Sequence, residues 1–374
     1  MMVKIRPASA AAILLALFAC NRDGQAPVVV LDRPELSFDR TFRQVSNVVE
    51  LTDGRIALAE LKDKTFLFAD LTSGETSSIG EHTDTIRPND PAPGKHRLPG
   101  YVLRFGGDTV GLVDFGAQRT TLWSEKGEFI ATLSGAGVGG YNQPLAYDAR
   151  RNGYKEDIRS VLGGLEPGQE LDLDSLSILR IAPNDTVADT IAHLKLPVWG
   201  RGQFGVQQKI VSTIFSGRDL FGVLPDGSLW VARASNNAVD WRAPDGTWTP
   251  GPSRPFARIL VPQAEKDAFL ERLRVQMAQM GAPAGIELSY PFADEKPPFG
   301  AGLTNPAGEV WLQRSREWAD SVPVWDVVGR DGKQIRTVQL PRNSSLAGFG
   351  PAGRIYLILR EGEEQQKIVR YVVK

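Results

Sequence analysis

Residues 134–144, SGAGVGGYNQP, form the stretch of this sequence whose residue types most directly suggest chemistry. Gly135, Gly137 and Gly140 match the pattern G-x-G-x-x-G, in which a tight glycine turn brings backbone N–H groups to the pyrophosphate of a dinucleotide. Such a site also needs a helix directly after the turn, because the helix N-terminus supplies those N–H groups. Pro144 and residues typical of β-strands follow instead. We therefore expect a connection between strands here, and no nucleotide site.

Metal chemistry finds little support in the sequence. The three histidines, His82, His96 and His193, do not stand in H-x-x-H or H-E-x-x-H spacing. Acidic pairs such as Asp172 and Asp174 lie in polar segments, where carboxylates are ordinarily solvated. The nucleophile pattern G-x-S-x-G does not occur. We predict no metal site and no cofactor, and calcium held by carboxylates and carbonyls is the open alternative.

Glycine turns predict the elements that would position any site. Five stretches share an apolar strand, a tight turn and a second apolar strand, and they start at Leu51, Phe105, Leu224, Asn305 and Gly350. A second turn follows most of them farther along the chain, at Gly74, Gly127, Asn184, Gly246 and Gly332. Two hairpins per unit make a four-stranded meander. Such a small sheet is stable only when it packs on neighbouring units.

Counting units by these turns gives six, which start near Arg43, Leu98, Pro144, Phe215, Pro298 and Ser344. Radial packing of such units makes a β-propeller, so we predict an all-β, six-bladed β-propeller over residues 28–374. The last unit ends without a fourth strand, and we expect residues 27–38 to close this last blade as its outer strand. A two-domain β-sandwich is the alternative architecture.

Residues 112–147 resemble the NHL repeat of β-propellers, and the matching positions are Asp114, Arg119, Gly127, Gly137, Gly139, Tyr141 and Pro144. A second, looser match starts at Trp230, and elsewhere the likeness is one of strand-and-turn rhythm. The chain is thus similar to NHL-repeat and TolB-like six-bladed propellers. In that group, some lyases use histidines around the central channel and lactonase-like members hold calcium near the axis. The few histidines here argue against carrying over the lyase activity.

The first twenty residues resemble a bacterial lipoprotein signal. Lys4 and Arg6 precede an apolar run, AAAILLALFA at residues 10–19, that is too short to span a bilayer. Residues 17–20, LFAC, are similar to a lipobox, although Phe18 is bulkier than the small residue usual there. The resemblance implies a signal peptide over residues 1–19, lipidation of Cys20 and a tether over residues 20–27. An ordinary secretory signal is the alternative.

Cys20 is the only cysteine of the chain, which fits an anchor better than a disulfide. We expect a protein of the bacterial cell envelope that faces the periplasm and touches the membrane only through its lipid. Asn21, rather than aspartate, follows the cysteine and points to the outer membrane.

One segment departs from the β pattern. Residues 262–281, PQAEKDAFLERLRVQMAQMG, predict a helix inserted between blades 4 and 5. Its apolar stripe consists of Phe269, Leu273, Met277 and Met280. We expect this stripe to pack on the propeller, and a lid over the central channel or a docking surface for a partner is the alternative.

The loops opposite the glycine turns should share one face, where hydrogen-bond donors and an aromatic ring converge. The candidate ligand-binding residues there are Arg119, Arg233, Asn237, Arg314 and Trp318. The balance of 43 Lys and Arg against 44 Asp and Glu gives no charge excess that would attract nucleic acid.

We predict a monomeric envelope lipoprotein that binds a protein, peptide or glycan through this face. No residue set identifies a catalytic site, so an enzyme is the second choice. That alternative is a lactonase-like hydrolase or lyase with a divalent ion in the central channel. A third alternative is a subunit of an envelope assembly that docks through residues 262–281.

Overall fold

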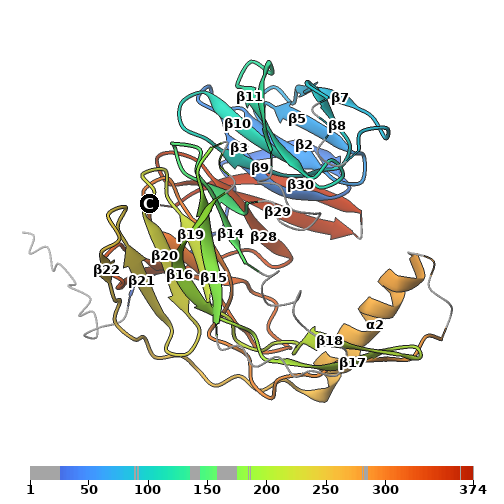
Figure 1. The fold of residues 1–374 in the computed structure, drawn as a ribbon, viewed down its shortest axis with the longest axis vertical. Helices are drawn as coiled ribbons and strands as arrows, with labels where there is room; N and C mark the ends of the chain where they lie inside the picture. The colour runs from blue at the N-terminus through green and yellow to red at the C-terminus, as the bar shows by residue number, and fades with distance from the viewer. Residues whose placement is uncertain are drawn as a thin grey trace, which may run out of the picture.

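The computed structural model of this chain describes residues 26–87, 90, 92–134, 144–157, 175–183, 185, 187–279, 281, 285–362 and 364–373. Cys20, the signal segment and most of the glycine-rich stretch after residue 134 lie outside these ranges. The described part is almost entirely β, and it is organised as small sheets that follow one another along the chain (Figure 1).

We number the four- and five-stranded sheets in chain order. The first sheet contains β3 (Val45–Glu50), β4 (Ile56–Glu60), β5 (Thr65–Ala69) and β6 (Thr76–Ser78). The second contains β9 (Pro99–Arg104), β10 (Thr109–Asp114), β11 (Arg119–Ser124) and β12 (Phe129–Ser134). The third contains β13 (Ala146–Tyr147), β14 (Gly153–Glu156), β15 (Ser175–Ile181) and β16 (Ala188–Lys195).

The fourth sheet contains β19 (Leu220–Val223), β20 (Leu229–Arg233), β21 (Ala238–Arg242) and β22 (Trp248–Thr249). The fifth contains β24 (Phe299–Thr304), β25 (Val310–Arg314), β26 (Val324–Val328), β27 (Gln334–Gln339) and β1 (Val28–Val30). The sixth contains β28 (Ser344–Phe349), β29 (Arg354–Gly362), β30 (Gln365–Val372) and β2 (Leu36–Phe42). A short parallel pair, β7 (Glu81–His82) and β8 (Lys95–His96), lies between the first two sheets in the chain.

The turns form where glycine permits a positive φ. Gly54 and Gly227 have φ values of 89° and 84° in the first turns of their sheets, and Gly246 has a φ of 96° in the second turn of the fourth sheet. A side chain with a Cβ rarely adopts this backbone conformation, which is why these turns can be recognised in the sequence.

Each sheet packs its faces on its neighbours. Phe66 of the first sheet lies 5.8 Å from Trp123 of the second, measured between ring centroids. Phe105 and Tyr147 join the second and third sheets at 5.1 Å. The other junctions are continuous apolar clusters, which pair Tyr154 with Leu229, Trp230 with Val310, Trp325 with Ile355, and Tyr356 with Leu58. The sixth sheet thus packs on the first, and the organisation is that of a β-propeller.

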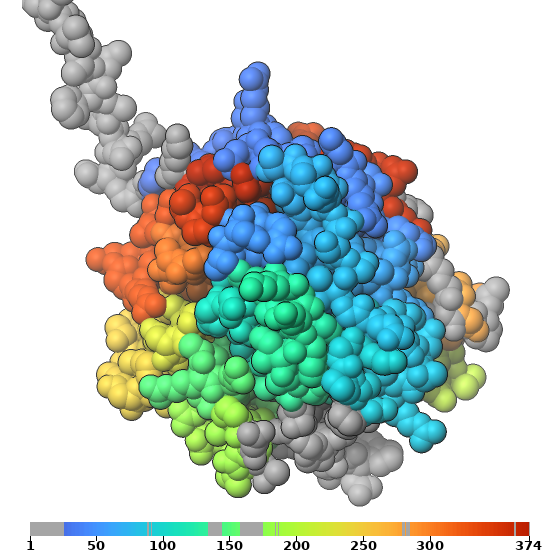
Figure 2. All heavy atoms as spheres, turned by 90° about the horizontal axis from the view of Figure 1, so that it is seen from above, coloured from blue at the N-terminus to red at the C-terminus, as the bar shows by residue number. Residues whose placement is uncertain are grey.

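The N-terminal segment holds the two ends of the chain together, and Figure 2 shows the first, blue segments beside the last, red ones. β2 pairs antiparallel with β30, with Leu36 opposite Arg370, so this segment supplies the outer strand of the sixth sheet. The prediction is wrong for residues 28–31. Val28 lies opposite Thr337 because β1 pairs in parallel with β27 of the fifth sheet. Pro34 has no N–H to donate to a ladder, and the chain changes sheets there.

A separate layer lies between the third and fifth sheets in the chain. It combines the hairpin β17 (Trp199–Phe204) and β18 (Gln207–Ser212), the short strand β23 (Leu288–Ser289) and the helix α2 (Gln263–Gln279) (Figure 1). Phe269 of α2 contacts Tyr290 and Phe292, with ring centroids 6.0 Å and 5.7 Å apart. The sequence predicts the helix but not this hairpin. No helix in the described residues is long and apolar enough to span a membrane.

The helix is tied down by a buried ion pair. Lys296 Nζ lies 2.7 Å from Glu265 Oε1, and both side chains are 8% exposed. The same ammonium donates a hydrogen bond of 2.8 Å to the carbonyl oxygen of Arg316, which follows β25. The predicted stripe is only half-buried at Phe269 and Leu273, so this polar contact and the aromatic cluster together position α2.

We expect Phe38→Ala to lower the free energy of unfolding by about 3–5 kcal/mol, because Phe38 of β2 is fully buried in the cluster between the sixth and first sheets. Chemical denaturation checks this value. Val28→Ala is the matched control, since Val28 is 54% exposed and its loss should change stability by less than about 0.5 kcal/mol. Equal effects of the two substitutions would show that β2 does not hold the chain ends together.

Candidate functional site

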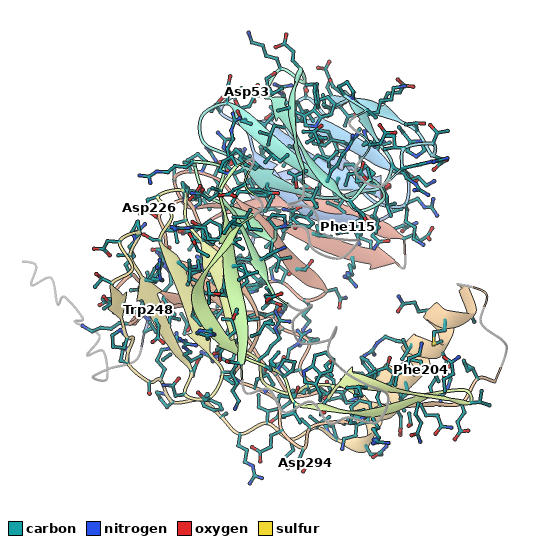
Figure 3. All side chains as sticks on the ribbon, in the orientation of Figure 1. Asp53, Phe115, Phe204, Asp226, Trp248 and Asp294 are labelled. Atoms are coloured by element: carbon teal, nitrogen blue, oxygen red, sulfur yellow. The ribbon has the colours of Figure 1, made fainter. Side chains whose placement is uncertain are left out.

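The meander gives the molecule two different faces. The glycine turns gather on one face, the turn face, formed by residues 51–55, 105–109, 224–228, 305–309 and 350–354. The connections between second and third strands gather on the other, the loop face, formed by residues 61–64, 115–118, 234–237 and 315–323. Figure 3 labels Asp53 and Asp226 on the turn face and Phe115 on the loop face.

A cavity of about 480 Å³ opens on the loop face where the sixth sheet meets the first, and we call it the seam cavity. Residues from both ends of the chain line it: Arg43, Gln44, Val45, Ser46, Lys62, Ser345, Ile358, Arg360, Glu364 and Gln366. All but two of these side chains are polar or charged. The connection from β2 to β3 contributes Arg43 and Gln44 to this lining.

Half-exposed ion pairs form one wall of the seam cavity. Arg43 lies 2.8 Å from Glu364 and 3.3 Å from Asp63, and each of these side chains is about half exposed. The Arg43 hydrogen bond lowers the pKa of Glu364, so the carboxyl stays ionised. Exposed pairs contribute little to stability, so these groups can exchange partners with a ligand at low cost. Arg360 is also exposed and adds a guanidinium to the same cavity.

Buried polar groups fix the backbone around this cavity. Gln366 Oε1 accepts a 2.7 Å hydrogen bond from the N–H of Val45. Glu60, 1% exposed, accepts hydrogen bonds of 2.5 Å from the main-chain N–H groups of Gln44 and Asp63. Burial raises the pKa of Glu60, although those N–H groups act in the opposite direction. Glu60 therefore holds the two loops that carry Arg43 and Lys62.

Arg119 is 1% exposed, the least of the predicted ligand-binding residues. Its guanidinium donates to the carbonyl oxygens of Asp90, Ala92 and Lys95, the last two at 3.0 Å and 2.7 Å. Burial lowers its pKa. The side chain thus holds the long connection between the first two sheets. These partners could not be inferred from the local sequence, because the connection lies more than twenty residues upstream.

Arg233 and Asn237 lie together on the fourth sheet, but their side chains have different partners. Arg233 lies 2.9 Å from Asp219 and 2.8 Å from Asp240, and only 27% of its side chain is exposed. Asn237 is 7% exposed and has a φ of 52°. Its main-chain and side-chain oxygens accept hydrogen bonds of 2.8 Å and 2.9 Å from Arg254.

Arg314 and Trp318 are the two predicted residues with large exposed areas, 47% and 45%. Arg314 makes two hydrogen bonds with Asp326, of 2.5 Å and 3.1 Å. Arg254 was not among the predicted residues, and it is 8% exposed. Burial and the charge of Arg314 lower the pKa of Arg254, whereas the charge of Asp326 raises it. Arg254 contacts Asn237, whereas Arg314 contacts Asp326. Arg119 belongs to the second sheet and does not join them.

The histidines form no metal centre within the described ranges, where no group of three or more His, Cys, Asp or Glu side chains is close enough to hold an ion. His82 and His96 lie opposite each other on β7 and β8, with ring centroids 6.1 Å apart. His96 is 3% exposed and its Nε2 lies 3.2 Å from the carbonyl oxygen of Lys64. His193 is exposed on β16.

No family model matches this sequence, and no curated protein matches it. Several solved structures of propeller type are similar in shape. A streptogramin B lyase has 13% identity and a TM-score of 0.40, covering 89% of this chain and 96% of its own. A gluconolactonase from Xanthomonas campestris has 12% identity and a TM-score of 0.38, covering 93% and 98%.

A PQQ-bound aldose sugar dehydrogenase from Streptomyces coelicolor has 12% identity and a TM-score of 0.44, covering 90% of this chain and 96% of its own. Because these TM-scores are below 0.5, the activities of these proteins are not assigned to this chain. The candidate site is defined by the side chains of this chain alone.

Burial lowers the pKa of His96, which makes stability depend on pH. The unfolded chain takes up a proton below about pH 6.5 while the folded chain does not, so the free energy of unfolding should fall from pH 6.5 toward the folded pKa. Between these two pKa values, the free energy of unfolding should change by at most about 1.4 kcal/mol per pH unit.

Unfolding measured at pH 7.5 and pH 5.5 checks this expectation. His96→Asn should reduce the pH dependence, whereas His193→Asn, which changes an exposed histidine, should retain it. An unchanged slope in the His96 variant would assign the effect to other groups.

Proposed function

We propose that this protein is a lipid-anchored, six-bladed β-propeller of a bacterial envelope that recognises a partner through its loop face. The seam cavity carries the proposal: it is a polar cavity of about 480 Å³ that opens on the face where propeller loops converge. Its ligand is a protein, peptide or glycan of the envelope.

Six blades are the count that the packing supports. Six successive sheets each contain four antiparallel strands, and apolar or aromatic contacts join each sheet to the next and the sixth to the first. β1 is then a fifth strand added to the fifth blade. The layer of α2 and β17–β18 is an insertion on this ring.

The lining of the seam cavity favours a ligand with an acidic group. Arg360 offers a planar guanidinium fork that binds a carboxylate with two hydrogen bonds. Arg43 and Lys62 are paired with Glu364 and would exchange this exposed carboxylate for that of the ligand. Ser46 and Ser345 add hydroxyl groups that both donate and accept. An acidic peptide side chain or an acidic sugar presents the matching oxygens.

The proposed anchor would place this recognition in the envelope. Lipidation of Cys20 and removal of residues 1–19 would leave the folded part in the periplasm, with the outer membrane as the expected site of attachment. Cys20→Ser should abolish labelling by palmitate and release the protein from the membrane fraction. Retained labelling in that variant, or a soluble wild-type protein, would contradict the anchor without touching the binding proposal.

The alternative is a hydrolase or lyase that uses a divalent ion in the central channel. It follows from the resemblance of the sequence to lactonase-like propellers, and within the described residues no group of three or more His, Cys, Asp or Glu side chains could hold the ion. Metal analysis of the purified protein separates the two functions, because stoichiometric calcium or zinc would favour the enzyme.

The binding proposal is tested with an array of acidic and neutral glycans and peptides. We expect acidic probes to bind the wild type, and the double variant Arg43→Ala/Arg360→Ala to bind them at least tenfold more weakly, because both forks are lost. Arg258→Ala is the control, since Arg258 is 72% exposed and does not line the cavity. Equal binding by the double variant would overturn the assignment of the seam cavity.

A further inference from the structure

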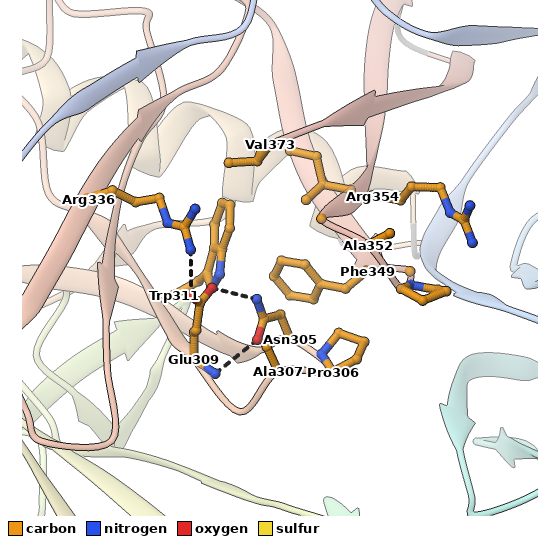
Figure 4. A pocket seen from close by; sticks show the side chains of 14 residues that line it. Asn305, Pro306, Ala307, Glu309, Trp311, Arg336, Phe349, Ala352, Arg354 and Val373 are labelled. Atoms are coloured by element: carbon orange, nitrogen blue, oxygen red, sulfur yellow. Dashed lines mark hydrogen bonds and ion pairs between the residues drawn. The ribbon is translucent and has the colours of Figure 1, made fainter.

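Charged side chains join the sixth sheet to the first at both ends of their junction. At the turn face, Arg354 of β29 donates a 3.0 Å hydrogen bond to Glu50 of β3, and the hydroxyl of Tyr356 donates one of 2.6 Å to the same oxygen. Figure 4 shows Arg354 at the edge of a small cavity of about 70 Å³ on this face. The side chain of Glu50 is 1% exposed. Breaking a buried pair of this kind is costly, so this end of the junction stays closed.

The contact at the loop face is of a different kind. Arg43, in the connection from β2 to β3, donates hydrogen bonds of 3.0 Å and 2.8 Å from its Nε and Nη2 to one oxygen of Glu364. The other oxygen of Glu364 lies 3.7 Å from Lys62 Nζ. The three side chains are between 46% and 50% exposed. Because exposed ion pairs contribute little to stability, this contact can open at low cost.

The hairpin that carries Glu364 has a fixed base and an exposed end. Gly362 of β29 pairs with Gln365 of β30 next to the turn, beyond the part of β29 that pairs with β28. The base is held by Gln366, which is 7% exposed and accepts a 2.7 Å hydrogen bond from the N–H of Val45. Glu364 can therefore leave Arg43 while the floor of the seam cavity keeps its shape.

The carboxylate of Glu364 meets Arg43 and Lys62 as an acidic group of a ligand would. Guanidinium and ammonium donors around one carboxylate are the usual means by which proteins bind acidic groups. The hydrogen bond from Arg43 lowers the pKa of Glu364, so the carboxylate is ionised at neutral pH. Two of the three cations that line the seam cavity are thus occupied. The third, Arg360, makes no ion pair within the described residues.

We propose that Glu364 is an internal competitor for the acidic ligand of the seam cavity, an inference that rests on the binding function proposed above. In the free protein, its carboxylate occupies the subsite formed by Arg43 and Lys62. An acidic group of the ligand takes its place on binding. The ligand gains contacts with these two cations while Glu364 loses its own, so the exchange adds little affinity. Glu364 therefore keeps the affinity below what three free cations would give.

Calorimetric titration of the protein with a capped triglutamate peptide tests the proposal. Glu364→Gln removes the competing charge and keeps the size of the side chain. We expect this variant to bind triglutamate about threefold to tenfold more tightly than the wild type, because Arg43 and Lys62 are then free for the peptide. The midpoint of chemical unfolding should stay close to that of the wild type, because the substituted side chain is half exposed.

Glu295→Gln is the matched control. Glu295 is 45% exposed and lies 2.5 Å from Arg258, and neither residue lines the seam cavity. This variant loses the same charge and should bind triglutamate as the wild type does. Adding Glu364→Gln to Arg43→Ala should change the affinity by less than about twofold, because the guanidinium that Glu364 occupies is already gone.

Three results would overturn the proposal: no tighter binding by Glu364→Gln, an equal gain in Glu295→Gln, or a full gain when Arg43 is absent. If the wild type binds triglutamate and Arg43→Ala/Arg360→Ala loses it, an unchanged affinity in Glu364→Gln removes the competitor and leaves the seam cavity as the binding site. Binding by Glu364→Gln alone would support the competitor and contradict an acidic ligand for the wild type. Absence of binding by both proteins would overturn both proposals.

Discussion

Burial of apolar sheet faces against their neighbours is the interaction on which the rest of this structure depends. A four-stranded sheet on its own leaves both faces in water, and here each face is covered only because another sheet follows. The ends of the chain take part in this packing as well. β2 pairs with β30 and so completes the sixth sheet, which packs on the first. The seam cavity, the loop face and the turn face are all consequences of that packing.

Buried carboxylates shape the loop face in a repeated way. Asp114 accepts hydrogen bonds from the main-chain N–H groups of Leu98 and Gly116, at 2.9 Å and 3.0 Å. Asp219 does the same for Lys195 and Ala234, both at 3.0 Å. A carboxylate that satisfies several backbone donors fixes a loop without help from a metal ion. Asp114 and Asp219 therefore hold the backbone at the base of the loop face in the second and fourth sheets.

Local rules made the strands, their turns and the helix predictable, because positive-φ glycines and the 3.6-residue period leave marks in adjacent residues. The site residues were less predictable. Arg119 looked like an exposed donor because its acceptors lie in a distant connection, and Arg254 stands in a segment without any regular pattern. The seam cavity combines Arg43 with Arg360, which only the tertiary fold brings together. The passage of the chain from the fifth sheet to the sixth at Pro34 was also not predictable, because it depends on which sheet edges the other strands leave unpaired.

The parallel direction of β1 determines how an anchored molecule would stand on its membrane. β27 begins at the turn face, and β1 runs beside it in the same direction, so the polypeptide enters the fold from that side. If residues 20–27 form the proposed tether, they reach at most about 29 Å when fully extended. With lipid on Cys20, the seam cavity would look outward into the aqueous compartment. The turn face, from which β1 enters the fold, would then lie on the side of the bilayer.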